Sequence, residues 1–266
     1  MGSKTKIDWC DATWNPVTGC NNRCEYCYAR KMARRFGGSA IKKYGLIGLF
    51  GACRFGEEKI VLDKPFRNDE GKIDPYPIEF YPTFHLYRLD EPQKWKKKKN
   101  IFVCSMADLF GDWVPELWIT RVFSACEKVP QHNYIFLTKN FKRVIALEKK
   151  GLLPSKHWYG YTATKESDLL HFHHADECSI KNMFISIEPI QEYMKFTIST
   201  HCPADWIIVG AETGKRKQKI IPDESWLDSI IINNFYGGIP VFMKESLRYL
   251  AGDNFIQEYP KGLKNE

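Results

Sequence analysis

The sequence lacks any long apolar segment and any recognisable export signal. None of its hydrophobic runs approaches the about 18 consecutive residues that a membrane-spanning helix needs. The opening residues, MGSKTKIDWCDATWNP, contain no apolar stretch of the kind that a secretory signal carries. We therefore expect a cytoplasmic protein without a membrane partner.

The chain contains nine cysteines, an odd number that cannot all pair with one another in disulfides. Disulfides persist mainly in exported proteins, and no export signal is visible here. A disulfide framework is therefore not expected. Reduced thiols or metal ligands are the better interpretation.

Acidic residues are fewer than basic ones, 32 against 39, and the formal net charge is +7. Such a charge favours an anionic partner, and nucleic acid is the partner that we consider. Surface solubility alone would also account for it. The run Lys96–Lys99 is interpreted as a solvated loop, with contact to phosphate groups as the alternative.

Short apolar runs alternate with amphipathic segments along the C-terminal two thirds of the chain. Runs that are continuous in apolar character are typical of strands buried on both faces, as in parallel sheets. Residues 116–128 and 222–233 place apolar side chains at helical spacing. The pattern predicts an α/β fold, a partial or full TIM-type (β/α) barrel in a single domain of residues 1–266. The expected strands are residues 101–104, 134–137, 158–161, 183–187, 206–209 and 239–243, after a short first strand around residues 13–18.

Residues 36–99 do not follow this alternation. They are rich in glycine, proline and aromatic residues, and they contain two candidate strands at residues 59–62 and 84–86. We interpret the region as an insertion after the first strand of the barrel.

Polar side chains follow each of the expected strands. In β/α barrels the chemistry takes place at the C-terminal strand ends, so one shared pocket is expected. The alternative is that strand ends are polar because they meet solvent. The residues are Ser105 and Asp108, Thr138 and Lys139, Thr162 and Thr164, Glu188, Glu212 and Thr213, and Lys244 and Glu245.

Three cysteines lie close together in CNNRCEYC, residues 20–27, with the spacing C-x3-C-x2-C. Thiolates from one short loop can converge on one metal centre, and soft thiolates select zinc or iron–sulfur clusters. A structural zinc site is closed by a fourth ligand, whereas a [4Fe-4S] cube on three cysteines keeps one iron open. We predict metal ligation by Cys20, Cys24 and Cys27, with Tyr26 as an aromatic wall. A zinc loop that takes its fourth ligand from elsewhere is the alternative.

This motif, its position near the N-terminus and the β/α pattern after it resemble the radical SAM superfamily. A narrower resemblance covers nearly the whole chain and is to a phage- and prophage-associated radical-SAM-like family of unknown function. Its genes lie beside a three-Cys-motif partner protein. The segments that carry this resemblance are IDWCDATWNPVTGC, CYARKMARR, IFVCSMADLF, FLTKN, WYGYTAT, FISIEP, WIIVGAETG and IPVFMKE.

The resemblance implies a TIM-type barrel, a [4Fe-4S] cluster and S-adenosylmethionine (SAM) as cofactors. SAM would chelate the open iron and be cleaved reductively to a 5'-deoxyadenosyl radical. It also implies an external electron donor of the flavodoxin or ferredoxin type, and a three-Cys-motif partner protein. The chain departs from the pattern at Cys10, where the family has threonine. It departs again at residues 105–108, where the superfamily has Gly-Gly-Glu.

The strand-end residues can be given roles by their chemistry. Ser105 and Asp108 would hold the SAM ammonium or ribose, and the hydroxyls of Thr162 and Thr164 would contact the ribose or carboxylate. The catalytic candidates, which we expect at the barrel mouth, are Glu188, Glu212 and Lys244.

Burial would raise the pKa of either glutamate unless a cation lies near it, and Lys139 or Lys244 could supply that cation. A structural ion pair is the alternative for Glu188 and Lys244. Cys104 and Cys126 are expected to be small buried hydrophobes. A second cluster built from Cys10, Cys53, Cys178 and Cys202 is left open, and the histidines between His157 and His174 are expected on a surface helix.

We therefore expect a radical SAM enzyme that modifies or repairs a nucleic acid or nucleotide. One alternative is a radical SAM enzyme for a small molecule or peptide. Another is a non-enzymatic binding module that carries zinc or a cluster.

Overall fold

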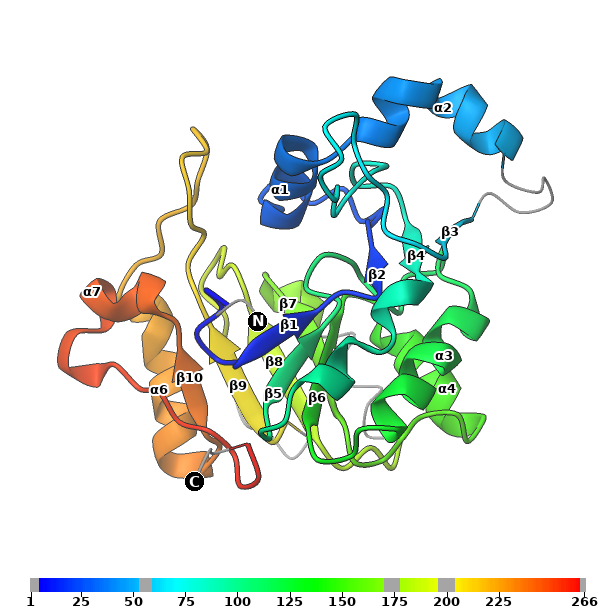
Figure 1. Ribbon diagram of the computed structural model, residues 1–266. Helices are drawn as coiled ribbons and strands as arrows, with labels where there is room; N and C mark the ends of the chain where they lie inside the picture. The colour runs from blue at the N-terminus through cyan, green and yellow to red at the C-terminus, as the bar shows by residue number, and fades with distance from the viewer. Residues whose placement is uncertain (1–4, 53–58, 170–177, 196–203, 264–266) are drawn as a thin grey trace. The chain divides into compact units, whose positions relative to one another are not determined.

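The main sheet has seven strands in this computed structural model, which describes residues 5–52, 59–169, 178–195 and 204–263 (Figure 1). The strand order is β1-β5-β6-β7-β8-β9-β10, and the strands from β6 to β10 pair in parallel. The prediction of an α/β fold with a parallel sheet is confirmed. The strands are β1 (Ala12–Trp14), β5 (Asn100–Val103), β6 (Asn133–Thr138), β7 (Trp158–Ala163), β8 (Met183–Ile187), β9 (Trp206–Val209) and β10 (Val241–Met243).

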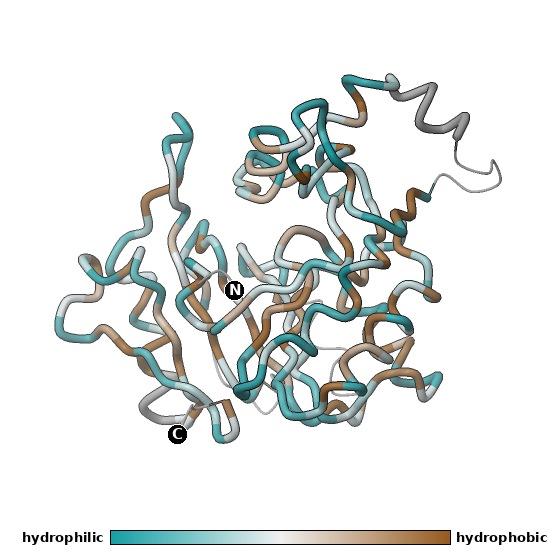
Figure 2. The backbone as a smooth tube through the Cα atoms, in the orientation of Figure 1, coloured by the Kyte–Doolittle hydropathy of each residue, from teal (hydrophilic) through white to brown (hydrophobic). Residues whose placement is uncertain are grey.

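Most of these strands, namely β5, β7, β8, β9 and β10, are buried at every residue. Strands covered on both faces have no side open to water, so their apolar character is continuous rather than alternating. Figure 2 shows the hydrophobic stretches along the strands and the hydrophilic ones in the connecting loops. This burial is why the strands could be located from the sequence.

Helices follow the strands, as the alternation predicts. They include α3 (Glu116–Glu127), α4 (Phe141–Lys149), α5 (Glu166–Leu169), α6 (Ser225–Gly237) and α7 (Arg248–Ala251), with short 3-10 turns η4 (Glu245–Leu247) and η5 (Gly252–Asn254). The spacing places four apolar side chains on one face of α3, and all four are buried: Ile119, Val122, Phe123 and Cys126. No helix in the described part of the chain combines the length and apolar character that crossing a membrane requires.

Residues 36–99 contribute two of the three strands of a second, smaller sheet. Its order is β2-β4-β3, from β2 (Val17–Thr18), β4 (Thr83–His85) and β3 (Ile60–Leu62). The two strands predicted within this region are therefore confirmed. The other elements are the end of α1 (Tyr28–Phe36), α2 (Ser39–Ala52), η1 (Leu86–Arg88) and η2 (Glu91–Lys94).

The predicted first strand, residues 13–18, is divided between the two sheets. β1 ends at Trp14 and β2 begins at Val17. Pro16 lies between them and has no N–H to donate to a strand neighbour, which favours a break in the ladder. Its carbonyl instead accepts from the backbone N–H of His85, in the smaller sheet, at 2.8 Å.

The chain divides into two compact units. Unit 1 contains residues 1–12, 99–101 and 133–266, and unit 2 contains residues 13–98 and 102–132. The core of unit 1 gathers aromatic rings around the fully buried Trp206, whose ring centroid lies 6.1 Å from that of Trp9 and 5.7 Å from that of Phe184. In unit 2, Phe84 stacks on Trp118 with 5.1 Å between centroids.

A buried arginine joins the insertion to the connection between β1 and β2 within unit 2. Arg88 donates from Nη1 to the Asn15 carbonyl at 3.0 Å and from Nη2 to the Pro75 carbonyl at 2.7 Å. Its own carbonyl accepts from Trp14 Nε1 at 2.8 Å. Because a buried cation is costly without partners, these bonds fix the insertion against the first strand.

The prediction of a surface helix for the histidines is wrong for His157. This residue directly precedes β7 and is buried, with its ring 5.3 Å from that of Tyr134 and 5.7 Å from that of Phe136. Burial lowers the pKa of His157 to about 3, and the nearby Lys156 contributes in the same direction. The other three histidines, His171, His173 and His174, lie outside the described residues.

Candidate functional site

The three cysteines of the motif lie in the loop of unit 2 that connects β2 to α1, and each is partly exposed. Cys27 is the N-cap of α1, and its Sγ accepts a hydrogen bond from the Arg30 backbone N–H at 3.3 Å. The Cys20 Sγ accepts from the Asn22 N–H at 3.5 Å. The loop thus ends at a helix N-terminus, where backbone N–H groups favour negative charge.

The sulfurs of this loop influence one another electrostatically. Burial raises the pKa of the Cys20 thiol to about 12; the Asn22 hydrogen bond opposes this, and Asp108, Cys24 and Cys27 add to it. Negative charge on Cys24 or Cys27 therefore disfavours negative charge on Cys20. A cation that binds them removes this repulsion and releases the protons.

Three thiols from one loop are a donor set that either zinc or an iron–sulfur cluster accepts. Three thiols come from one loop, and backbone N–H groups point at two of the sulfurs, as cluster-binding loops provide. Within the described residues, no three His, Cys, Asp or Glu side chains form a group that could hold a single metal ion.

The predicted SAM-contacting residues of unit 2 lie beside the cysteine loop. Asp108 is buried, and its Oδ2 accepts from Asn22 Nδ2, two residues after Cys20, at 3.0 Å. Ser105 donates from Oγ to Asn15 Oδ1 at 3.2 Å, and its carbonyl accepts from the Tyr28 hydroxyl at 2.8 Å. The structure therefore brings these two residues together with the cysteine motif.

Two residues that hold this arrangement were not singled out from the sequence. Asn15 also accepts from the Met106 N–H at 2.9 Å, so one amide oxygen holds the loop after β5. Asn22 joins that loop to the cysteines. Their signal in the sequence is weak, because an asparagine in a turn-forming run is common without any such role. Tyr26 lies in the cysteine loop and is partly buried.

In unit 1 the structure brings Glu188 and Lys244 together. Lys244 Nζ lies 2.7 Å from Glu188 Oε1, and the two side chains are 25% and 19% exposed. Ser186 donates from Oγ to the other carboxylate oxygen at 3.1 Å. A Cβ on Gly210 would lie 2.8 Å from Glu188 Oε1 and 2.9 Å from Lys244 Cδ, so a larger residue there would force these two side chains to shift.

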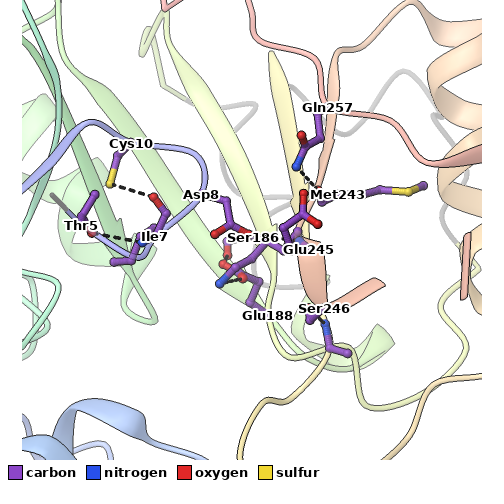
Figure 3. A network of polar contacts seen from close by, with 12 residues as sticks. Thr5, Ile7, Asp8, Cys10, Ser186, Glu188, Met243, Glu245, Ser246 and Gln257 are labelled. Carbon is purple, nitrogen blue, oxygen red and sulfur yellow. Dashed lines mark hydrogen bonds and ion pairs between the residues drawn. The ribbon is translucent and has the colours of Figure 1, made fainter. Parts of the chain in front are cut away.

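Further acidic groups near Lys244 come from the N-terminal segment. Burial lowers the pKa of Lys244, but Glu188, Asp8 and Cys10 together outweigh it and hold the pKa above its ordinary value. Asp8 Oδ2 also accepts from the Glu245 N–H at 3.1 Å (Figure 3). Sequence reasoning gave Asp8 no role, because this contact joins residues 237 positions apart.

Glu212 is held by a different cation. Arg216 donates from Nε to Glu212 Oε1 and from Nη2 to Oε2, both at 2.8 Å, and the carboxylate side chain is 3% exposed. The cation beside Glu212 is thus Arg216, four residues on, rather than the Lys139 or Lys244 that we considered. Glu245 forms a similar but exposed pair with Arg248.

Two of the threonines at the strand ends, Thr138 and Thr164, form hydrogen bonds with residues close to them in the sequence. Thr164 donates from its N–H and its hydroxyl to Asp168 Oδ2, at 2.7 and 3.1 Å, where α5 begins. Thr162 is buried within β7, opposite Ser186 of β8. Thr138 Oγ1 accepts from the Asn140 N–H at 2.9 Å before α4. Contacts from Thr162 and Thr164 to a ribose stay a prediction.

The described cysteines are free thiols. Cys104 and Cys126 are 2% and 0% exposed, which confirms that they are buried. Cys10 is also buried, and Cys178 is partly exposed. Cys53 and Cys202, which a second cluster would need, lie outside the described residues.

Comparison with known proteins gives one match. The model of the family described as "Protein of unknown function (DUF5131)" matches residues 4–257. No curated protein and no solved structure matches the chain.

Proposed function

The chain belongs to the DUF5131 family, and we propose that it is a radical SAM-type enzyme whose [4Fe-4S] cluster is held by Cys20, Cys24 and Cys27. One observation carries the proposal. The three thiols come from a single loop that ends at a helix N-terminus and precedes the β/α units of a parallel sheet. Three thiolate ligands leave one iron of a cube open, which a closed zinc site does not.

A bound cluster with SAM on its open iron would supply reductive cleavage of SAM and hydrogen abstraction from a substrate. The residues of the chain have supporting tasks. The N–H groups of Asn22 and Arg30 donate to sulfurs of Cys20 and Cys27, which lowers the cost of negative charge there. Asp108 keeps the loop in register through Asn22, and Ser105 is held by Asn15.

The proposed substrate is a nucleic acid or nucleotide that is modified or repaired. The support is the net charge of +7 and the number of arginines in and after the cysteine loop. A small molecule or peptide substrate is the alternative. The proposal includes a TIM-type barrel, a cytoplasmic location, an electron donor of the flavodoxin or ferredoxin type and a three-Cys-motif partner protein.

Anaerobic reconstitution with iron and sulfide, followed by dithionite and SAM, tests the proposal. We expect about four irons and four sulfides per chain, and formation of 5'-deoxyadenosine without any added substrate. The single variants Cys20→Ala, Cys24→Ala and Cys27→Ala should lose both. Cys126→Ala, which changes a buried thiol on α3, is the matched control and should keep both.

The same preparation separates the competing functions. About one zinc per chain, with no sulfide, would instead identify a zinc-bearing binding module. A cluster that cleaves SAM, together with a protein that binds neither DNA nor RNA, would favour the small-molecule or peptide alternative.

A further inference from the structure

A cavity of about 790 Å³ opens beside the cysteine loop, entirely within unit 2. Cys20 and Asn21 form one edge of it, and the residues from Ile78 to Tyr81 form another. Three arginines line it: Arg23 from the cysteine loop, and Arg30 and Arg34 from α1. One carboxylate, Glu79, lines it as well, so the lining carries a positive net charge.

The three guanidinium groups have no carboxylate partner among the described residues. Arg30 and Arg34 are four residues apart on α1, so they project from the same side of the helix. Like charges so placed repel each other, and an anion between them would remove that repulsion.

Aromatic side chains form part of the wall. Phe80 lines the cavity, and the Arg30 guanidinium lies 5.7 Å from the centroid of its ring. Tyr81 lines the cavity next to it. Guanidinium groups beside aromatic rings are the combination with which single-stranded nucleic acid is bound, through phosphate contacts and base stacking.

Backbone strain is concentrated at the same place. Three non-glycine residues in the described part of the chain have positive φ, and two of them, Arg23 at 54° and Glu79 at 49°, line this cavity. Such conformations cost about 1 kcal/mol or more and tend to persist at ligand sites. Two of the three strained positions therefore lie in the lining of this cavity.

We propose that this cavity binds a single strand of nucleic acid, with its phosphates on Arg23, Arg30 and Arg34 and a base against Phe80. The inference rests on the proposed function, because it gives the substrate of that function a binding surface. Since Cys20 lines the same cavity, a strand bound there lies beside the cluster.

Fluorescence anisotropy with a labelled single-stranded 20-mer, as DNA and as RNA, tests this with the cluster-loaded protein. The double variant Arg30→Gln/Arg34→Gln should weaken binding by about tenfold or more at low salt. The slope of log Kd against log salt should fall by about 0.7 for each phosphate that the variant no longer neutralises. Phe80→Leu should weaken binding by about tenfold with an unchanged slope, because it removes stacking and not charge.

The matched control is Arg121→Gln/Lys128→Gln, which removes the same charge from exposed positions on and just after α3. It should change the affinity less than about twofold. Arg30→Lys/Arg34→Lys keeps the charge and should retain most of the salt slope. Iron content and thermal midpoint are measured for each variant, and binding is compared only among variants that match the parent protein in both.

Three outcomes would overturn the inference while leaving the radical chemistry intact. In the first, both double glutamine variants weaken binding equally. In the second, the cavity variants bind the strand normally but lose affinity for SAM, which makes the cavity a cofactor site. In the third, they bind the strand normally but are reduced more slowly by a flavodoxin, which makes this face a docking site for the donor. Strand binding through the cavity without any SAM cleavage would instead support the inference and refute the proposed reaction.

Discussion

Lys244 Nζ and Glu188 Oε1 lie 2.7 Å apart, at the ends of two strands that are separated in the sheet by β9. Gly210, which directly follows β9, lies beside them without a side chain that could hold them apart. The pair therefore spans three neighbouring strand ends, β8, β9 and β10. Its geometry suits a structural brace as well as a catalytic pair, and variants can separate the two roles.

Removing one partner should destabilise the protein. For Glu188→Gln or Lys244→Met we expect a loss of about 2 kcal/mol in the free energy of unfolding. This is less than the about 3–5 kcal/mol of a fully buried pair, because both groups retain some exposure. The double variant should recover about 0.5 kcal/mol or more of the summed losses, which is the coupling expected for residues in contact. Urea denaturation measures all four proteins.

A catalytic role for this pair predicts a loss of activity that is separate from the loss of stability. If the pair takes part in the reaction, the double variant should retain its cluster and its fold but lose turnover. If the double variant is stable and forms 5'-deoxyadenosine with its substrate at the parent rate, the pair has a structural role only.

A methyl group at Gly210 should disturb the same pair. Gly210→Ala places Cβ within 3 Å of side-chain atoms of both partners, which must shift. Overpacking costs about 1–3 kcal/mol, and we expect the lower end of this range because the two side chains are flexible. Thermal or urea unfolding gives the magnitude. In the background Glu188→Ala/Lys244→Ala the same substitution should cost less than about 1 kcal/mol. An equal cost in both backgrounds would show that the backbone, and not the ion pair, requires the glycine.

His157 should make the protein sensitive to acid. Burial lowers its pKa from 6.5 to about 3 in the folded state. Between these values the unfolded chain binds a proton that the folded chain does not, so the stability falls as the pH falls. The slope is at most about 1.4 kcal/mol per pH unit. Urea denaturation from pH 7 to pH 4 measures it.

His157→Phe, which keeps an aromatic ring among Tyr134 and Phe136, should reduce this slope. Tyr159→Phe serves as the control. It removes the hydrogen bond from the Tyr159 hydroxyl to the Pro154 carbonyl, and should cost about 1 kcal/mol at every pH. A slope unchanged by His157→Phe would assign the acid sensitivity to other groups, such as His85, whose pKa burial and Arg88 lower to about 2.

Asn15 should matter for the cysteine loop although it lies outside it. Asn15→Ala leaves the Met106 N–H and the Ser105 hydroxyl without their acceptor, at a cost of about 1–3 kcal/mol. The Met106 carbonyl accepts in turn from the Gly19 N–H at 2.9 Å, next to Cys20. We therefore expect lower iron incorporation on reconstitution as well as lower stability. Asn15→Asp keeps an acceptor oxygen and should incorporate more iron than Asn15→Ala.

The strands were predictable because most of them are buried along their whole length. The run of residues 183–187 and the run of residues 206–209 coincide with β8 and β9 to the residue. The prediction was less successful where local sequence does not decide the outcome. The division of residues 13–18 between two sheets depends on which partners the strand meets, and the burial of His157 depends on rings from β6 and β7.

The candidate site was predictable to the extent that it is local. Cys20, Cys24 and Cys27 are neighbours in the sequence, and the structure places them in one loop before α1. The shared metal that their spacing predicts stays a prediction. Glu188 and Lys244 were considered as an ion pair because parallel strands end at the same edge of a sheet, and the structure confirms that the two side chains are paired. Asp8 beside Lys244, and Arg216 on Glu212, depend on how distant or looped segments pack, which no spacing rule describes.

The bonds of Arg88 imply that the long insertion cannot be trimmed away. A shortened protein without residues 36–99 would lose the guanidinium that occupies the Asn15 carbonyl, and with it the acceptor for the Trp14 indole. Those unpaired groups would lie only a few positions before the first cysteine of the motif. Any minimal version of this protein must therefore retain the stretch from Pro75 to Arg88, however much is removed around it.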